Sequence, residues 1–392
     1  MTLAEEILSK KSGMRAEAGD IVEASIDKAM SHDNAALVIK KFKEIGAKLW
    51  DPSKIVIILD HRVPANTIKT AEGHKAIREF VKQNEIENFY DINYGICHQV
   101  MIEEGHVEKG ILIVGTDSHT TSYGALGAFS TGIGATEMAS VWATGKLWLK
   151  VPETYKIVVN GSIPKGVYAK DIILHIIGRL KADGANYKAI EYYGIVEDMP
   201  LADKITISNM SMEMGAKAAM FYGSNDGIYE KEFKFDVSEL SPQIACPHTV
   251  DNVKSIEEVE GLEINQAMLG SCTNGRIEDL RIAAKILKGK RIAKGVRMLV
   301  FPASMKIYRQ ALEEGLVKTF MEAGAVMMNP GCGPCLGAHE GVLASGEAAI
   351  TSTNRNFRGR MGSKEADVYL ASPASVASSA IEGKIADPRK YL

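Results

Sequence analysis

The chain alternates between short runs of apolar residues and longer stretches in which apolar residues recur at helical spacing. Residues 54–60 and 111–115 are nearly continuous apolar runs, which predict buried strands. Helical spacing predicts helices over about 66–83 and 135–149. The same alternation predicts three further strands, at 155–159, 266–271 and 296–301.

These predicted strands are apolar throughout instead of alternating, so helices are expected to cover both faces of their sheets. That arrangement is typical of an α/β protein. Two changes in composition suggest domain boundaries. One is the proline that follows the helix ending near 149, and the other is the polar and charged stretch from 241 to 260. We therefore predict three domains, over residues 1–152, 153–254 and 255–392.

Polar and reactive side chains gather where the predicted strands end. They are Asp60-His61, Asp117-Ser118-His119, Cys272 and Cys332. Ligands of open α/β sheets bind at the carboxyl ends of the strands, so a site is expected there. Taken singly, an aspartate near a histidine is more often a helix cap or a turn residue.

Three of the five cysteines have a spacing that suits a metal centre. Cys272 stands alone, and Cys332 and Cys335 are spaced C-x-x-C. Three thiolates can hold three corners of an iron–sulfur cube, which normally takes four. The fourth iron then keeps an open position, where substrate chemistry can occur. The C-x-x-C pair also fits a thiol–disulfide oxidoreductase, or a zinc site with Cys272 and His339.

The composition and charge of the chain argue against a membrane-spanning, secreted or nucleic-acid-binding protein. The 392 residues are 46% hydrophobic and 24% charged, as in soluble globular proteins. A net charge of −3 gives no indication of nucleic acid or an anionic membrane as partner. No apolar run approaches the roughly 20 residues of a membrane span, and no secretory signal is visible. Five cysteines do not form a disulfide framework, so a cytoplasmic location is expected.

A basic segment follows the cysteines. Residues 354–360 contain three arginines and a glycine. They could form a solvated turn, or they could bind carboxylates, which guanidinium groups grip through two oxygens.

Four motifs in this order resemble the aconitase superfamily, in particular its 3-isopropylmalate dehydratase and homoaconitase large subunits. They are Gly115-Thr116-Asp117-Ser118-His119-Thr120, Ser271-Cys272-Thr273-Asn274, Cys332-Gly333-Pro334-Cys335 and Asn354-Arg355-Asn356-Phe357. The resemblance covers essentially the whole chain. It implies three α/β/α domains around a central cluster cleft. It also implies a [4Fe–4S] cluster held by Cys272, Cys332 and Cys335, with one open iron.

The resemblance also assigns roles to the remaining candidates. Three imidazole–carboxylate pairs are implied for proton transfer: His61 with Asp60, His98 with Asp117, and His119 with Glu213. Ser118, Arg355 and Arg360 are implied to bind the substrate, and Asn209 and Asn354 to lie near the cluster. The implied reaction dehydrates and rehydrates a hydroxy-dicarboxylate or hydroxy-tricarboxylate.

Two departures from the family pattern matter. In full-length aconitases the base is a serine on a fourth, swivelling domain, whereas this sequence ends at Leu392. We therefore expect a separate small subunit to supply that domain and its serine. Tyr123 also stands where many relatives of this type have histidine, and the segment 222–241 looks short.

Three functions remain open at this stage. The first is a hydro-lyase, with 3-isopropylmalate dehydratase of leucine biosynthesis ahead of homoaconitase and 2,3-dimethylmalate dehydratase. The second is a cluster-binding regulator without catalysis. The third is a thiol oxidoreductase. The presence of all the acid–base candidates favours the enzyme over the regulator.

Overall fold

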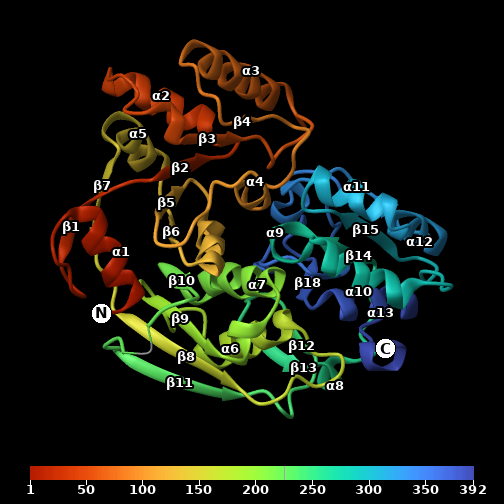
Figure 1. Ribbon diagram of the computed structural model, residues 1–392. Coiled ribbons are helices and arrows are strands. Elements are labelled where there is room, and N and C mark those ends of the chain that lie inside the picture. Colours follow the sequence, from red (N-terminus) through yellow and green to blue (C-terminus); the bar gives the residue numbers. More distant parts are fainter. Residues whose placement is uncertain (225) are drawn as a thin grey trace. The chain divides into compact units, whose positions relative to one another are not determined.

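The computed structural model describes residues 1–224 and 226–392, and its chain divides into two compact units (Figure 1). Unit 1 consists of Met1–Ile92, Val100–Val159 and Ala185–Phe235. Unit 2 consists of Asn93–Gln99, Asn160–Gly184 and Asp236–Leu392. The chain therefore passes between the units several times. The division into three domains, with boundaries near 152 and 255, stays a prediction.

A parallel five-stranded sheet organises the first part of unit 1. Its order is β4-β3-β2-β5-β6, with β2 in the centre. The strands are β2 (Lys28–Ser31), β3 (Ile55–Ile58), β4 (Phe89–Tyr90), β5 (Leu112–Gly115) and β6 (Phe129–Gly132). All residues of β3 and β5 are buried, as their apolar runs predict. Because β3 and β5 flank β2, the carboxyl ends of these three strands are neighbours.

Three helices of unit 1 share an aromatic core. They are α2 (Ala35–Ile45), α3 (Ile68–Gln83) and α5 (Ala135–Thr144), near the top of the view in Figure 1. Phe80 of α3 stacks on Trp142 of α5 at a centroid distance of 5.6 Å, and Phe42 of α2 meets both rings edge-on. Such pairs add about 0.5–1.5 kcal/mol beyond the apolar area they bury.

The predicted helix over 135–149 is too long. The helix ends at Thr144, where Gly145 follows with φ of 68°, and the chain continues as β7 (Lys146–Lys150). Strand β7 pairs antiparallel with β1 (Ile21–Ser25), and its buried and exposed residues alternate. Its alternation of buried and exposed residues has the period of a strand, not of a helix. A side chain at Gly145 would collide with the ring of Trp50, 2.3 Å from the Cβ position.

A four-stranded sheet, in the order β10-β9-β8-β11, forms the second part of unit 1. Its strands are β8 (Thr154–Asn160), β9 (Ala189–Gly194), β10 (Ala218–Met220) and β11 (Lys231–Asp236). Helices α1 (Leu3–Ser12) and α7 (Leu201–Ser211) belong to this unit, with the 3₁₀ turns η1 (Pro52–Lys54), η2 (Ser118–Leu126), η3 (Ile195–Asp198) and η4 (Met212–Met214).

A seven-stranded sheet organises unit 2, in the order β13-β12-β18-β17-β14-β15-β16. The strands from β18 to β16 are parallel, and β12 is antiparallel to β13 and β18. The bounds are β12 (Gln243–Ala245), β13 (Val253–Ser255), β14 (Gln266–Gly270), β15 (Arg297–Phe301), β16 (Val326–Met327), β17 (Ala348–Thr351) and β18 (Asp367–Leu370). Strands β14 and β17 are neighbours, so their carboxyl ends lie together.

Short and long helices complete unit 2. They are α6 (Ala169–Leu180), α8 (Ile256–Val259), α9 (Ser271–Asn274), α10 (Ile277–Leu287), α11 (Met305–Glu313), α12 (Leu316–Ala323) and α13 (Pro373–Glu382), with the 3₁₀ turns η5 (Gly333–Leu336) and η6 (Pro388–Tyr391). Helix α4 (Cys97–Glu103) lies at the passage from unit 2 to unit 1. Among residues 1–224 and 226–392, no helix has the length and apolar character needed to cross a membrane.

Candidate active site

Three neighbouring strand ends bring the acid–base candidates of unit 1 together. His32 and Asp33 follow β2, Asp60 and His61 come just after β3, and Asp117 comes just after β5. The sequence predicted the contributions of β3 and β5. It did not predict that of β2, which is the central strand and supplies two of the five side chains.

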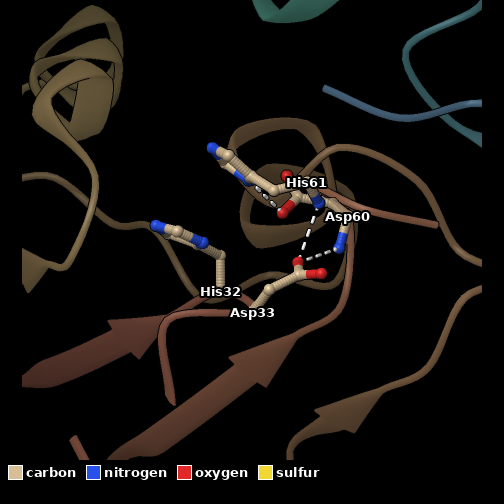
Figure 2. A group of neighbouring side chains, drawn as sticks. All are labelled: His32, Asp33, Asp60 and His61. Carbon is tan, nitrogen blue, oxygen red and sulfur yellow. Dashed lines mark hydrogen bonds and ion pairs between the residues drawn. The ribbon is translucent and has the colours of Figure 1, made fainter. Parts of the chain in front are cut away.

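Asp33 holds the loop that carries Asp60 and His61 (Figure 2). Its Oδ2 accepts hydrogen bonds from the backbone N–H groups of Asp60 and His61, at 2.9 and 2.8 Å. Its Oδ1 accepts one from the N–H of Arg62 and lies 2.8 Å from His74 Nε2. Burial acts to raise the pKa of Asp33, but the hydrogen bond with His74 and the nearby His61 lower that pKa below its usual range. The carboxylate is therefore ionised and fixes the loop.

His61 lies between two carboxylates. Its Nδ1 is 2.6 Å from Asp60 Oδ1, and its Nε2 is 3.4 Å from Asp117 Oδ2. Burial alone would lower the pKa of His61, but the charges and hydrogen bonds of Asp60 and Asp117 raise it well above its usual value. His61 is thus an imidazolium at neutral pH and can act as an acid.

His32 stacks on His61 and has the opposite protonation state. The ring centroids are 3.8 Å apart with an interplanar angle of 18°. Burial and the charge of His61 lower the pKa of His32 to about 4, so this ring is neutral at pH 7. Its Nδ1 accepts a hydrogen bond from the N–H of Asn34, and its Nε2 lies 3.3 Å from the carbonyl of Thr116. Neighbouring groups whose pKa values are pushed apart are typical of catalytic sites.

The same four side chains could be mistaken for a metal site. One donor atom from each of His32, Asp33, Asp60 and His61 lies within 4.8 Å of the others. However, each oxygen of Asp33 already has two hydrogen-bond partners, and Asp60 is paired with His61. We therefore interpret the group as a hydrogen-bonded network that sets the protonation of His61.

The network continues beyond Asp117. Asp117 Oδ1 accepts a hydrogen bond from the backbone N–H of His119 at 2.8 Å and lies 3.5 Å from its Nδ1. His119 Nε2 is 2.7 Å from Glu213 Oε1, so the implied contact between these two residues is present. Carboxylates and imidazoles thus alternate from Asp60 through His61, Asp117 and His119 to Glu213.

Two further candidates of unit 1 lie near this network. Asn209 donates a hydrogen bond through Nδ2 to Ser122 Oγ at 2.9 Å, and Ser122 Oγ donates to the carbonyl of His119. Ser118 is half-buried and, with Asp117, lines a cavity of about 350 Å³. This volume is in the range of small-ligand pockets. The substrate-binding role of Ser118 and the cluster contact of Asn209 stay predictions.

His98 is buried in α4 and belongs to unit 2, whereas Asp117 belongs to unit 1. The predicted pairing of His98 with Asp117 stays a prediction.

The cysteines of the predicted cluster site lie in unit 2. All five cysteines of the chain are buried thiols. Cys272 is the second residue of α9, not the residue after a strand ending at 271, because the strand ends at Gly270 and Ser271 begins the helix. The Asn354 amide lies between two of the thiols: Nδ2 donates to Cys272 Sγ at 3.4 Å, and Oδ1 accepts from Cys335 Sγ at 3.3 Å. Two cysteines far apart in sequence thus contact one side chain.

Cys332 and Cys335 are joined by a tight turn. The N–H of Cys335 donates to the carbonyl of Cys332 at 3.1 Å, at the start of η5. A Cβ at Gly333 would lie 2.1 Å from His339 Nε2, so a larger residue between the cysteines would have to displace this imidazole. Arg360 Nη2 lies 3.7 Å from Cys335 Sγ. Arg360 is half-buried, as is Arg355, so neither is a fully solvated turn residue.

Two buried cations hold the backbone around these thiols. Arg276 Nη1 donates to the carbonyl of Cys272 at 2.9 Å, and Nη2 donates to the carbonyl of Thr273. Lys170, with no exposed surface, donates through Nζ to the carbonyls of Ser352 at 2.9 Å and Thr353 at 2.5 Å. Both cations are outside the predicted site.

The missed residues have different sequence signals. His32 and Asp33 follow a four-residue strand with only two apolar residues, so the strand-end argument could not be applied. The cluster of Ser31, His32, Asp33 and Asn34 could have suggested a strand end by its composition. Lys170 carries no signal, since a lysine in the first turn of a helix is usually solvated.

A family model and several known proteins match this chain over nearly its whole length. The model of the aconitase family (aconitate hydratase) matches residues 5–227 and 222–383. The chain is 51% identical to 3-isopropylmalate dehydratase large subunit 1 of Methanopyrus kandleri, over 100% of this chain and 99% of that protein. It is 49% identical to the probable methanogen homoaconitase large subunit of Methanothermobacter thermautotrophicus, over 100% and 98%.

Among solved structures, the fold is similar to that of Thermococcus kodakaraensis aconitase X in its holo-form. The TM-score is 0.57 at 12% sequence identity, and the match covers 93% of this chain and 92% of that one. This similarity concerns the fold alone.

Proposed function

Because the chain belongs to the aconitase family, we propose that it is the large subunit of a hydro-lyase that dehydrates and rehydrates a hydroxy acid. The observation that carries this proposal is the alternation of carboxylates and imidazoles from Asp60 to Glu213, with His61 held as a buried acid. Loss of a hydroxyl group requires a proton donor, and an imidazolium oriented by carboxylates is suited to that task.

The thiols of unit 2 fit an iron–sulfur cluster, as family membership implies. Cys272, Cys332 and Cys335 are buried, and the Asn354 amide contacts the first and the last of them. Buried cations beside these thiols suit thiolate charge. We propose that the three cysteines hold a [4Fe–4S] cluster. When bound, such a cluster supplies a Lewis acid at the iron that lacks a cysteine ligand.

The remaining side chains are proposed to handle protons and carboxylates. His61 donates a proton from Nε2 to the departing hydroxide, while Asp60 holds its Nδ1 and fixes the ring. His119, held by Glu213, is the second acid–base group. Ser118, Arg355 and Arg360 bind the carboxylates of the substrate, where bidentate guanidinium contacts fix its orientation.

A separate small subunit is proposed to complete the site. The curated relatives are themselves named large subunits. We propose that the partner supplies the swivelling domain and the serine that removes the proton from carbon. We place the complex in the cytoplasm, where reducing conditions preserve thiolates.

Our first candidate for the substrate is 3-isopropylmalate, whose isomerisation is a step of leucine biosynthesis. The second candidate is the homoaconitase reaction, because the identity to a homoaconitase large subunit is nearly as high, at 49% against 51%. A 2,3-dimethylmalate dehydratase is a third candidate. Tyr123, which stands where many relatives of this type have histidine, is buried in η2. Comparing turnover of the candidate substrates can show whether this tyrosine accompanies a different substrate.

The test is a substrate panel with the anaerobically reconstituted large chain and its small subunit. Absorbance of the unsaturated intermediate reports turnover of 3-isopropylmalate, homocitrate-type acids and 2,3-dimethylmalate. The proposal expects iron and sulfide in the protein and turnover of one substrate, with little turnover by the large chain alone. A protein with cluster but no turnover would be the non-catalytic regulator. A protein that reduces disulfides without iron would be the thiol oxidoreductase, and one that retains only zinc would also contradict the proposal.

A further inference from the structure

Lys170 is the most deeply buried lysine of unit 2 with described hydrogen bonds, and the proposed function uses it only as a nearby positive charge. It lies in the first turn of α6 with no exposed surface. A buried lysine is costly unless other groups compensate its charge, so this position requires an explanation.

The partners of Lys170 are main-chain atoms next to the thiol site. Its Nζ donates to the carbonyls of Ser352 and Thr353, at 2.9 and 2.5 Å. The next residue is Asn354, whose amide contacts Cys272 Sγ and Cys335 Sγ. The ammonium therefore fixes the backbone from which the bridging amide projects.

Ser352 links the same segment to the strand that leads to Cys272. Its Oγ accepts a hydrogen bond from the N–H of Gly270 at 2.9 Å, and it donates to the carbonyl of Gly270 at 3.2 Å. Lys170 thus anchors the junction of the β14 and β17 ends.

The charge of Lys170 has acidic neighbours in the thiol site. Burial lowers its pKa to about 7, and the main opposing influences are Cys335, Asp279 and Cys272, followed by Asp171. Asp171 is the next residue on α6, and burial raises its pKa to about 7. Two of the four acidic groups that favour the ammonium are therefore proposed cluster ligands.

We infer that Lys170 is a positioning residue of the cluster site, which holds the Ser352–Asn354 segment against the thiols and adds a buried positive charge beside them. This inference rests on the proposed function. Groups that orient metal ligands typically change metal affinity 10–100-fold when they are removed. The reduction potential of an iron–sulfur cluster also depends on nearby charge and hydrogen bonds.

Three substitutions distinguish the hydrogen bonds of Lys170 from its positive charge. Lys170→Met removes both the hydrogen bonds and the charge, Lys170→Gln can keep a hydrogen bond without the charge, and Lys170→Arg keeps both. The control is Lys204→Met, which removes a buried lysine of unit 1 whose Nζ donates to Tyr222 Oη. The measurements use the reconstituted holo-protein: the rate of iron release to a chelator, the midpoint potential of the cluster, and the thermal midpoint of the apo-protein.

We expect Lys170→Met to release iron about 10–100-fold faster than wild type. We expect both neutral variants to have a lower midpoint potential, because a lost positive charge makes reduction less favourable. Lys170→Arg should restore the potential, and Lys204→Met should leave both properties unchanged. A purely structural lysine would lower the thermal midpoint without moving the potential.

The outcomes distinguish the two proposals. Wild-type protein that takes up no iron and sulfide would overturn the proposed function. A normal cluster in wild type, with iron release and potential unchanged in the neutral variants, would overturn only the role of Lys170. If Lys170→Met does not fold, Lys170→Gln decides by the same readouts. If none of the three variants folds, Lys170 is a folding residue and the inference is wrong.

Discussion

The proton-transfer network of unit 1 and the thiol site of unit 2 use charge in different ways. In unit 1, carboxylates and imidazoles contact one another through their side chains, from Asp60 to Glu213. In unit 2, the cations Lys170 and Arg276 bind main-chain carbonyls. The first arrangement sets which groups carry protons. The second holds the backbone and leaves the sulfur atoms to other partners.

This difference matches the two kinds of chemistry that the reaction needs. Proton transfer depends on pKa values, and direct ion pairs shift those strongly. A cluster site depends on the placement of its ligands, which backbone contacts control without competing for the ligand atoms. The contrast predicts that substitutions in unit 2 change iron content, whereas those in unit 1 change turnover at constant iron content.

The largest effect is expected for Cys272→Ala. Loss of one of three thiolates should prevent stable cluster binding, and turnover should fall about ten-thousandfold or more, because the Lewis acid is lost. Iron analysis and the coupled assay with the small subunit measure the two effects. Cys246→Ala, which removes a buried thiol of the same unit, should retain iron. Equal iron loss in both variants would contradict the assignment of Cys272.

The next largest effect is expected for His119→Ala. The variant should keep its cluster and lose about 100- to 10,000-fold in turnover, the usual contribution of one acid–base group. Glu213→Gln should lose less, because an amide can still hold His119 Nε2. Iron content and single-turnover kinetics test this prediction. Wild-type turnover in His119→Ala would remove His119 from the site.

The same contrast explains what the sequence could and could not predict. Asp60, His61, Asp117 and the cysteines could be predicted because they follow nearly continuous apolar runs or occur in motifs. Lys170 could not be found, since its acceptors lie about 180 positions away in the chain. Only the folded sheet, where β14 and β17 pair, brings α6 next to the Ser352–Asn354 segment.

The local pattern also failed where a strand has few apolar residues or directly follows a helix. Strand β2 is as long as β3 and β5, but only two of its four residues are apolar, so its polar end at His32 and Asp33 was not predicted. The helix predicted to continue to 149 ends at Thr144, because Gly145 follows with a positive φ. In both places, the strand exists because it pairs with distant strands, and single-segment patterns do not contain that information.

A smaller effect, mainly on stability, is expected for Asp33→Asn. The substitution removes an ionised acceptor that binds three backbone N–H groups and His74. We expect a loss of about 3 kcal/mol in the free energy of unfolding, measured by urea denaturation. The control Asp91→Asn breaks a partly exposed ion pair with Arg78 and should cost less than about 1 kcal/mol.

The pKa of Asp33 is lowered in the folded state, so its stabilising effect is present above the unfolded-state pKa and is lost as the pH falls through the folded-state value. Wild type and Asp33→Asn should therefore converge in stability at strongly acidic pH. Parallel stability curves down to that range would contradict the proposed role of the carboxylate.

The smallest effect is expected for Asp60→Asn, and it should be visible mainly in the pH profile. His61 has a raised pKa, so its imidazolium form is complete below its usual pKa and is lost only as the pH rises through the folded-state value. The charge of Asp60 is the largest influence that raises this pKa. Without the charge of Asp60, the pKa of His61 should fall, and the loss of turnover at alkaline pH (the alkaline limb of the pH profile) should therefore begin at a lower pH.

The expected loss is about tenfold on the alkaline side, equivalent to a pKa shift of about one unit, with little change at acidic pH. Steady-state turnover between acidic and alkaline pH, at constant iron content, measures the shift. Asp91→Asn serves again as the control and should leave the limb in place, because Asp91 contacts Arg78. An alkaline limb that stays in place in Asp60→Asn would mean that His61 is not the proton donor. The acid would then have to be sought at His119, an imidazole that also lies near Asp117.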